Sequence, residues 1–490
     1  MKVRELLDRV SVISASDELL DTEISGVTSN TAKVGKNFVF IAISGTKFDG
    51  HDFISAAAEM GAVCAVVERV PENCPIPCAV VENTRLASAY IFSNAFGRPE
   101  QSMKIIGVTG TNGKTSTVFM LERIFSEAGY RTALLGTVKN MWCGRVRESS
   151  MTTPVPEELY EMFAQMRDES VEYLFMEVSS HSLALGRVAP LEFEVGIYTN
   201  LTPEHLDFHP DMEDYAHTKE TMFKRSKIGL FCADNEYTLA ASKKGLCESY
   251  TFGISENCDF CAENACYSSV NGIKYGLSFK SGESIEIESS MAGKFSVYNT
   301  LGALACAELL SIDRQIAARA IKDFEGVPGR IERLTPEGHP FSVFSDYAHS
   351  PDALENILQT LASSKDRSQR LTVLFGCGGD RDRTKRPVMG RIATELADFA
   401  IVTSDNSRSE EPMDIISEIV SGIKKDNYKV ICSRRDAIAY AVENAISGEI
   451  ILVAGKGHEN YEITKDGKHP FDEKSEVLKA LEKRSGKETR

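Results

Sequence analysis

The sequence has less positive charge than a nucleic-acid-binding protein usually carries. Its 55 lysines and arginines stand against 71 aspartates and glutamates, which gives a formal net charge of −16 at pH 7. Nucleic acids are normally bound by a basic surface, so this balance argues against them as partners. Small phosphorylated ligands stay compatible with the composition, because a single pocket can be cationic on an acidic protein.

Long apolar runs are also absent from the 490 residues. None approaches the roughly 20 residues that a membrane-spanning helix needs, and the N-terminal segment has no apolar core of the signal-peptide kind. We therefore expect a cytoplasmic protein that is not inserted in a membrane. Internal repeats and low-complexity tracts are missing too, and the composition is that of a globular protein.

Cysteine is not scarce, but a clear zinc-binding arrangement of cysteines is missing. The twelve cysteines are scattered along the chain. Cys258 and Cys261 have the two-residue separation of many zinc ligands, yet no clear second pair follows and the segment around them alternates like strands. We therefore expect free thiols, which are typical of a cytosolic enzyme.

The length predicts several domains, because 490 residues are too many for one ordinary hydrophobic core. We place three domains at residues 1–103, 104–333 and 334–490. Apolar runs alternate with amphipathic stretches, which indicates an α/β fold with parallel sheets and right-handed connections. The segment from Tyr250 to Glu288 alternates more like antiparallel strands. The other expected strands are Asn37–Ile43, Ala62–Val67, Lys104–Thr109, Thr132–Leu135, Val171–Val178, Glu194–Thr199, Phe341–Ser345, Leu371–Phe375, Phe399–Thr403, Lys429–Cys432 and Glu449–Val453.

The strongest motif is a glycine-rich turn between an expected strand and an expected helix. It reads Gly110-Thr111-Asn112-Gly113-Lys114-Thr115-Ser116. Unpaired backbone N–H groups and the positive end of the helix dipole favour an anion at such a helix start. Gly110 and Gly113 let the backbone approach phosphates, Lys114 would reach the β- and γ-phosphates, and the Thr115 hydroxyl would ligate Mg²⁺.

This turn departs from the usual P-loop pattern at Val108, where that pattern has glycine. A chance Gly-Lys-Thr turn is therefore an alternative. A strand precedes the turn, however, and the stretch after it places Val118, Leu121 and Ile124 on one helical face. This context favours a nucleotide site.

Two further polar groups follow expected strands, at the edge where open parallel sheets bind ligands. Glu177 ends one strand and can coordinate Mg²⁺ held against triphosphate oxygens, although a serine-capped helix start would explain the same stretch. His205 and His209 could suggest zinc, but Pro203 and the loop context deny them a regular helical face. Magnesium ligation by His205 does not follow from residue chemistry, since Mg²⁺ prefers oxygen.

The ordered set of motifs resembles the Mur ligases and their folylpolyglutamate synthetase relatives. Because the motifs extend over almost the whole chain, the resemblance is highly specific. They are, in chain order, Gly110 to Thr115, Thr152-Thr153-Pro154, Glu177-Val178-Ser179-Ser180-His181, Asn200-Leu201-Thr202, His205-Leu206-Asp207, Tyr298-Asn299, Asp346-Tyr347-Ala348-His349 and Gly455-Lys456-Gly457-His458-Glu459. The resemblance implies a UDP-binding N-terminal domain, a central P-loop ATPase-like domain with a parallel sheet, and a Rossmann-like C-terminal domain for an amino acid.

The activity that the resemblance implies is ATP-dependent formation of a peptide bond in peptidoglycan precursor synthesis. ATP would convert a carboxylate of UDP-N-acetylmuramoyl-L-alanyl-D-glutamate into an acyl phosphate. The amine of an amino acid, which we expect to be meso-diaminopimelate, would then attack it and release phosphate. This chemistry needs alignment and charge stabilisation rather than a protein nucleophile. A monomer is expected.

The resemblance also assigns residues to ATP and magnesium. Besides the glycine-rich turn, Asn299, Arg330 and Asp346 are implied to bind ATP. Lys219, on sequence grounds a solvated helix lysine, is implied to react with CO₂, and the resulting carbamate is an anion that can hold Mg²⁺. The implied catalytic residues are Lys114, Glu177, His205 and Lys219, and the implied metal ligands are Thr115, Glu177, His205 and carbamylated Lys219.

The remaining implied residues bind the UDP-linked substrate. Two positions depart from the family pattern: Asn30 stands where arginine is common, and Leu185 stands where glutamine is common. The residues that match the uridine-diphosphate end are Val27, Ser29, Thr46, Lys47 and Phe48, and those that match the peptide end are Thr152, Thr153, Ser179 and Arg187.

The choice of diaminopimelate over L-lysine depends on one arginine. Diaminopimelate has an additional carboxylate, which a guanidinium can bind through two charge-assisted hydrogen bonds. Asp405-Asn406-Ser407-Arg408 resembles the Asp-Asn-Pro-Arg motif of diaminopimelate-adding members, with Ser407 in place of proline. Arg381, Gly455 and Glu459 match the other acceptor contacts. Arg408 could instead be a solvated residue paired with Glu410 or Glu411, and L-lysine stays the alternative acceptor.

Two other functions compete with this hypothesis. A folylpolyglutamate-synthetase-like ligase shares the P-loop chemistry but lacks an N-terminal uridine-binding domain, so residues 1–103 argue against it. A nucleotide-dependent binding or switch protein predicts eroded catalytic positions. The presence of Lys114, Glu177, His205, Lys219 and His349 argues against that class.

Overall fold

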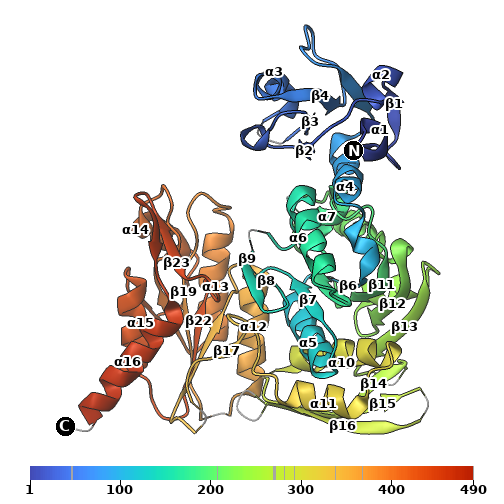
Figure 1. The fold of residues 1–490 in the computed structure, drawn as a ribbon. Helices are drawn as coiled ribbons and strands as arrows, with labels where there is room; N and C mark the ends of the chain where they lie inside the picture. The colour runs from blue at the N-terminus through green and yellow to red at the C-terminus, as the bar shows by residue number, and fades with distance from the viewer. Residues whose placement is uncertain are drawn as a thin grey trace. The chain divides into compact units, whose positions relative to one another are not determined.

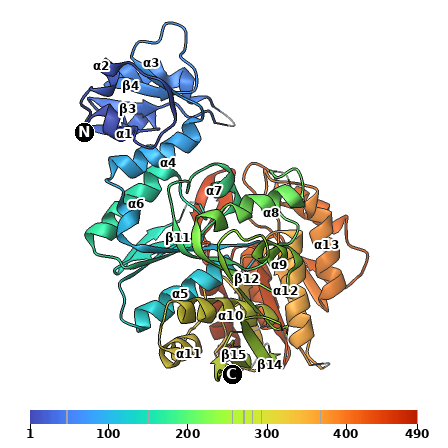
Figure 2. The same ribbon diagram turned by 90° about the vertical axis from the view of Figure 1, so that its right-hand side faces the viewer.

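The computed structural model describes residues 1–45, 48–149, 151–206, 208–255, 257–268, 272–280, 282–291, 293–336, 338–366 and 368–488. It separates into two compact units (Figures 1 and 2). The first unit holds residues 1–259 and 302–317, and the second holds residues 260–301 and 318–490. Both units combine helices with largely parallel sheets, so the expected α/β fold class is confirmed.

The first unit begins with a five-stranded sheet in the order β1-β5-β4-β3-β2. β2 to β5 are parallel, and β1 pairs antiparallel with β5. The strands are β1 Val12–Ser14, β2 Gly26–Thr28, β3 Phe38–Ile41, β4 Ala62–Val67 and β5 Cys78–Val81. The α-helices are α1 Val3–Leu6, α2 Asp17–Leu20, α3 Ile54–Glu59 and α4 Thr84–Ala95, and the 3₁₀ turns are η1 Thr31–Lys33, η2 Gly50–Phe53 and η3 Pro99–Ser102.

The larger sheet of the first unit has the strand order β13-β12-β11-β6-β10-β7-β8-β9. The strands from β13 to β7 in this order are parallel, and β8 and β9 extend the sheet as an antiparallel hairpin. The strands are β6 Lys104–Thr109, β7 Thr132–Leu135, β8 Lys139–Trp142, β9 Arg145–Glu148, β10 Tyr173–Glu177, β11 Phe193–Tyr198, β12 Ser226–Cys232 and β13 Glu248–Gly253. The helices are α5 Lys114–Glu127, α6 Pro156–Asp168, α7 Ser180–Ala184, α8 Met212–Glu220, η4 Phe223–Arg225 and α9 Glu236–Ser242.

The second unit contains an antiparallel three-stranded meander and a six-stranded sheet in the order β17-β18-β22-β19-β20-β21. The six-stranded sheet is parallel except for its edge strand β17. The strands are β14 Phe260–Ser268, β15 Gly272–Phe279, β16 Ser284–Ser289, β17 Glu332–Arg333, β18 Ser342–Asp346, β19 Leu371–Phe375, β20 Phe399–Val402, β21 Tyr428–Val430, β22 Ile450–Ala454 and the hairpin β23 Tyr461–Thr464 with β24 Gly467–Pro470. Its helices are α12 Pro351–Ser364, α13 Lys385–Leu396, α14 Pro412–Val420, α15 Arg434–Glu443 and α16 Glu473–Glu488, and the unit boundaries fall inside α10 Lys294–Leu309 and α11 Arg314–Lys322.

One hydrophobic core joins the two sheets of the first unit, and a smaller separate core that includes Phe40, Ala65 and Val67 belongs to the N-terminal sheet alone. The joining core includes side chains of the N-terminal sheet, of α4 and α6, and of the larger sheet. Ile91 and Phe92 of α4 and Met162 and Phe163 of α6 are all at most 1% exposed. The segment that leads from α4 to β6 is the 3₁₀ turn η3, in which Pro99 and Glu100 are buried and Gln101 and Ser102 are exposed. The Glu100 carboxylate accepts a hydrogen bond from Ser93 Oγ at 2.7 Å.

Several expected elements coincide with the observed ones. β4, β6, β7 and β19 occupy the expected residues, since each is a short apolar run that is buried on both faces. The expected antiparallel stretch from Tyr250 is partly wrong. β13 (Glu248–Gly253) is parallel to β12, and the antiparallel strands begin at Phe260.

The expectation of free thiols is confirmed for ten cysteines and wrong for two. Cys258 and Cys261 are disulfide-bonded, and the ten others are free. A two-residue separation allows a local disulfide as readily as a metal site, and sequence alone does not distinguish these outcomes. In the described ranges, no helix has the length and apolar character needed to cross a membrane.

Candidate nucleotide and amino-acid sites

The turn between β6 and α5 has the shape of a phosphate-binding loop. Gly110 has a φ of 143°, and a Cβ on it would lie 2.0 Å from Thr199 Oγ1. Gly113 has a φ of 86° and directly precedes α5. Glycine reaches such conformations without the steric penalty of other residues. The two glycines thus allow the sharp turn that leads into α5, and the N-terminus of a helix favours an anion.

The loop is held in place by the segment that follows β11. Thr111 N donates to the carbonyl of Asn200 at 3.0 Å, and Asn112 N donates to Asn200 Oδ1 at 2.9 Å. Thr199 Oγ1 donates to the Asn112 carbonyl at 2.6 Å. The structure thus brings together two motifs that lie about 90 residues apart in the chain.

Lys114 and Thr115 begin α5 at this loop. Lys114 Nζ donates to the carbonyls of Gly110 and Thr111, both at 2.8 Å, so the ammonium lies over the loop. Thr115 is buried, and Ser116 beside it is partly buried. The remainder of α5 packs through Val118, Leu121 and Ile124 as expected, since all three are fully buried.

Glu177 ends β10, the strand that lies between β6 and β7 in the sheet. It is paired in register with Val108 of β6 and is 1% exposed. Thr137 donates its N–H to Glu177 Oε1 at 2.7 Å and its hydroxyl to Oε2 at 3.1 Å. A Cβ on Gly136 would lie 2.4 Å from Oε1, so a larger residue there would push this carboxylate away. These contacts fix a carboxylate beside the phosphate-binding loop.

Lys219 is not the solvated lysine that its helical position suggests. It is 1% exposed, and its Nζ donates to the Gly110 carbonyl at 3.0 Å and lies 3.4 Å from Thr109 Oγ1. Burial, aided by the charge of Lys114, lowers the pKa of its amine well below the ordinary value. A buried amine with a lowered pKa is available as a nucleophile, because more of it is unprotonated.

His205 lies in the loop after β11, in the left-handed conformation with a φ of 58°. Its ring centroid is 4.9 Å from that of His181, and its Nε2 is 3.7 Å from Glu204 Oε2. His205 is 42% exposed, whereas His209 is buried and contacts Asp214 at 2.7 Å through Nδ1. The two histidines therefore do not form the zinc pair that their spacing could suggest.

The oxygen atoms near the loop fit magnesium rather than zinc. Over the described part of the chain, no three histidine, cysteine, aspartate or glutamate side chains gather as a metal cage. Mg²⁺ usually takes one or two protein carboxylates and completes its shell with phosphate oxygens and water. The Thr115 hydroxyl and the Glu177 carboxylate are donors of this kind, and a carbamate on Lys219 would be another.

The predicted peptide-end residues lie together next to Glu177. Thr153 Oγ1 donates to the Glu177 carbonyl at 2.8 Å and accepts from Ser179 N at 3.1 Å. Arg187 Nη1 donates to the Thr153 carbonyl at 2.9 Å, and the Thr152 and Thr137 hydroxyl oxygens are 3.1 Å apart. Thr152, Thr153, Ser179 and Arg187 thus form one polar cluster beside the phosphate-binding loop.

Beside Val27 and Ser29, which are predicted to bind the uridine end, the structure places a carboxylate that the sequence did not point to. Glu157, at the start of α6, accepts hydrogen bonds from Thr28 Oγ1 at 3.2 Å, from Ser29 N and Oγ at 3.3 Å, and from Lys33 Nζ at 3.0 Å. Val27 lies on β2, and Phe48 is 73% exposed. Thr46 and Lys47 lie outside the described residues.

The other predicted ATP-binding residues belong to the second unit. Asp346 ends β18 and accepts from Ile331 N and Ala348 N, both at 2.8 Å. Burial raises the pKa of its carboxyl, although the nearby Arg330 opposes that change. The Arg330 guanidinium lies 5.1 Å from the ring centroid of Tyr347, and Asn299 is buried in α10.

The predicted acceptor residues of the second unit gather at the ends of β20 and β22. Asn406 Oδ1 accepts from Lys456 Nζ and from Ile463 N, both at 2.9 Å. Its Nδ2 therefore points the other way and donates to Glu459 Oε2 at 2.8 Å. Lys456 is fully buried. It orients two of the predicted acceptor residues, although the family resemblance assigns it no role of its own.

Asp405 and Gly455 complete this arrangement. Burial alone would raise the pKa of the Asp405 carboxyl, but Lys456 and Arg434 hold that pKa below its ordinary value. Gly455 has a φ of 121°, and a Cβ on it would lie 2.7 Å from Asp405 Oδ2. Glycine is therefore required where the end of β22 approaches this carboxylate.

Arg408 does not form the ion pairs with Glu410 or Glu411 that were the alternative to a role in acceptor binding. Its Nη1 donates to the carbonyls of Gly379 and Asn406 at 2.8 and 3.3 Å. Glu410 pairs with Arg386 and Glu411 with Lys465, and no ion pair of Arg408 occurs within the described residues. Ser407 is buried, and Arg381 is exposed in the loop after β19.

These features define an α/β protein with a P-loop in one unit and a buried polar cluster at the strand ends of the other. Comparison with known families agrees with this class. Three family models match: "Mur ligase family, catalytic domain" at residues 23–104, "Mur ligase middle domain" at residues 108–307, and "Mur ligase, glutamate ligase domain" at residues 329–457. The chain belongs to the Mur ligase family.

Individual relatives match over nearly the whole chain. UDP-N-acetylmuramoyl-L-alanyl-D-glutamate--2,6-diaminopimelate ligase of Clostridium botulinum is 42% identical over 94% of this chain and 95% of its own. The ligase of the same name from Clostridium tetani is 41% identical over 98% and 99%. A solved structure of a ligase with this name is 29% identical, with a TM-score of 0.71 over 99% of both chains.

Proposed function

We propose that this protein is the ATP-dependent ligase that adds meso-diaminopimelate to UDP-N-acetylmuramoyl-L-alanyl-D-glutamate. The observation that carries the proposal is the cluster of the P-loop, Glu177 and Lys219 in a chain that is similar over 94% of its length to ligases of that name. The product joins a carboxyl group of the UDP-linked dipeptide to the amine of the acceptor.

The chemistry follows from a substrate carboxylate that is a poor electrophile. Transfer of the γ-phosphoryl group of ATP to this carboxylate gives an acyl phosphate and ADP. The acceptor amine then attacks the acyl carbon, and phosphate leaves. Lys114 is suited to neutralise the transferring phosphoryl group, and backbone N–H groups at the start of α5 bind its oxygens.

Magnesium would be held by Thr115, Glu177, His205 and a carbamate on Lys219, and it would neutralise further charge on the phosphates. Thr137 fixes the Glu177 carboxylate by two hydrogen bonds, so this ligand is oriented before the nucleotide binds. The lowered pKa of the buried Lys219 amine supports its reaction with CO₂, since only an unprotonated amine can attack that molecule.

The substrates are assigned to three parts of the chain. Residues 1–103 would bind the uridine end, residues 104–333 ATP and the peptide end, and residues 334–490 the amino acid. The three matched family ranges support this division. We propose that the protein acts in the cytoplasm as a monomer. Among the described residues, no helix is long and apolar enough to cross a membrane.

The test is release of phosphate from ATP with UDP-N-acetylmuramoyl-L-alanyl-D-glutamate, Mg²⁺ and a panel of amino acids. We expect rapid release with meso-diaminopimelate and much slower release with L-lysine. A wild-type enzyme that prefers L-lysine at equal concentration would show the alternative acceptor to be correct. Glutamate-dependent release with a folate substrate would instead favour a folylpolyglutamate-synthetase-like ligase.

Arg408→Ala should distinguish the two acceptors. We expect diaminopimelate-dependent kcat/KM to fall by about tenfold to a hundredfold, because the distal carboxylate loses its charged partner. Lysine-dependent activity should change far less, since lysine has no carboxylate there. The matched control is Arg391→Ala, which removes an exposed arginine of α13 that, among the described residues, forms an ion pair with Glu395 four residues on and no other. Equal losses with both acceptors would contradict the assignment of Arg408.

A further inference from the structure

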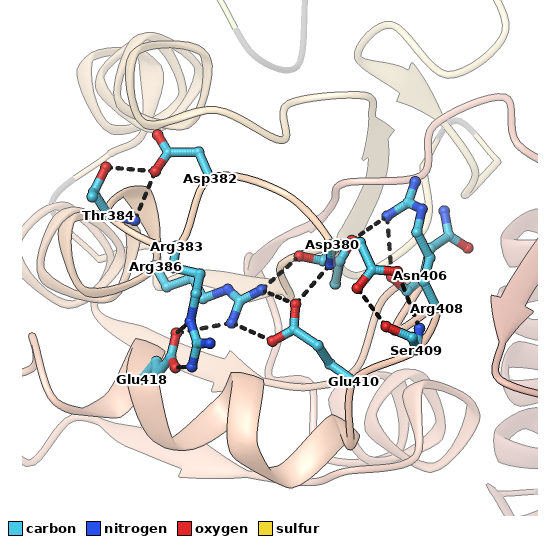
Figure 3. A network of polar contacts seen from close by, with 12 residues as sticks. Asp380, Asp382, Arg383, Thr384, Arg386, Asn406, Arg408, Ser409, Glu410 and Glu418 are labelled. Carbon is cyan, nitrogen blue, oxygen red and sulfur yellow. Dashed lines mark hydrogen bonds and ion pairs between the residues drawn. The ribbon is translucent and has the colours of Figure 1, made fainter. Parts of the chain in front are cut away.

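A buried arginine that is not among the predicted acceptor residues holds the loop that carries Arg408 (Figure 3). Arg386 lies on α13, and its side chain is fully buried. Its Nη1 and Nη2 donate to the two carboxylate oxygens of Glu410 at 2.9 and 2.8 Å, and Nη1 also donates to Glu418 at 2.8 Å. A guanidinium fork on a carboxylate fixes direction as well as distance.

Glu410 lies two residues after Arg408 and links two loops to α13. Besides the bonds from Arg386, it accepts a hydrogen bond from Asp380 N at 2.6 Å. Ser409 Oγ donates to Asp380 Oδ1 at 2.5 Å, between the same two loops. The hydrogen bonds from Arg386 lower the pKa of the Glu410 carboxyl to about 2, so the pair stays ionised at neutral pH.

The two loops are also packed backbone against backbone. Gly379 N donates to the Asn406 carbonyl at 2.8 Å, and a Cβ on Gly379 would lie 1.9 Å from the Ser407 carbonyl oxygen. Next to these contacts, Arg408 has a φ of 51°. A residue with a side chain keeps this left-handed conformation only where its surroundings hold it.

We propose that Arg386 and Glu410 are positioning residues for the amino-acid acceptor, because their ion pair holds the loop in which Arg408 keeps one orientation. The inference rests on the proposed function, since it takes Arg408 as the group that binds the distal carboxylate of diaminopimelate. Without the ion pair, the loop would sample other conformations. A displaced binding group then weakens the alignment of the acceptor with the reacting carbon.

Glu418 provides a matched control within the same network. It pairs with the same guanidinium and with Arg383, but it stands on α14, outside the loop. Both glutamates are partly exposed, so a glutamine at either position is tolerable to the fold. Arg386 itself is a poor test, because a substitution would leave two carboxylates beside a buried cavity.

The experiment measures steady-state kinetics and thermal unfolding of Glu410→Gln and Glu418→Gln. We expect Glu410→Gln to raise the KM for diaminopimelate about tenfold, with KM for ATP and kcat within about twofold of wild type. Glu418→Gln should leave all three constants within about twofold. Equal acceptor KM values in the two variants, or equal losses of kcat together with lower melting temperatures, would overturn the proposal.

A double-mutant cycle tests whether Glu410 acts through Arg408. In an Arg408→Ala background, Glu410→Gln should have little further effect on the KM for diaminopimelate. Independent, multiplying effects would contradict the positioning role. A different result would contradict the proposed function itself. A wild-type enzyme without diaminopimelate-dependent phosphate release would reject the ligase assignment. An active wild type with an unaffected Glu410 variant would reject only the positioning role.

Discussion

Lys114→Ala should reduce turnover by at least about a thousandfold, the order of magnitude that one cationic group supplies to a transferring phosphoryl group. The ammonium lies over the loop, at the Gly110 and Thr111 carbonyls, and it is the charge best placed to meet the γ-phosphate at the start of α5. Alanine is a good helix former, so α5 itself should persist.

The measurement is phosphate release at saturating substrates, together with a melting curve. Arg123→Ala is the matched control, because it removes from the same helix a cation that forms an ion pair with Glu127 four residues on. An exposed pair of this kind contributes about 0.3–0.5 kcal/mol, and turnover should be unchanged. Near-normal phosphate release by Lys114→Ala would reject the phosphate-binding role of the loop.

Lys219→Ala should retain less than about one per cent of wild-type turnover, because the anion that a carbamate supplies is worth several kcal/mol in a metal site. The side chain is buried and reaches Gly110, so its removal also opens a space at the loop. A small carboxylate such as acetate can enter that space and replace the missing anion. Added acetate should therefore restore part of the activity.

Lys219→Met distinguishes the loss of the anion from the loss of side-chain packing. Methionine fills a similar volume without an amine, so this variant should be equally inactive and should not respond to acetate. Thermal unfolding of both variants monitors the structural cost, which is expected to be larger for alanine because of the cavity. Substantial activity in Lys219→Met would show that no carbamate is needed.

The ATP site was predictable from sequence because its information is local. A strand, a glycine turn and a helix follow one another from Lys104 to Glu127, and both the periodicity and the glycines report them. The environment of Lys219 was not predictable from periodicity. Its helix position looks solvated, and its burial arises from contact with Gly110, which lies 109 residues earlier.

The surroundings of the predicted acceptor residues were even less predictable from the sequence than those of Lys219. The family resemblance predicted Asn406, Arg408 and Glu459 as acceptor-binding residues. The side chains that orient them, however, come from other parts of the chain. Lys456 contacts Asn406 across 50 residues, and Arg386 contacts Glu410 across 24. Arg386 lies in the highly charged run from Arg381 to Arg386, so the sequence does not indicate that its side chain is buried. The burial is a result of the fold.

The continuous core of the first unit has a consequence for how this part of the chain folds. Ile91 and Phe92 of α4 pack in the same core as Met162 and Phe163 of α6, and Glu157 joins α6 to the loop after β2. Each such aromatic or aliphatic side chain contributes about 1.5–3 kcal/mol when fully buried. We therefore expect the N-terminal sheet to unfold together with the P-loop sheet on heating, and a fragment that ends at residue 103 to expose the apolar side chains of α4 to water and to aggregate.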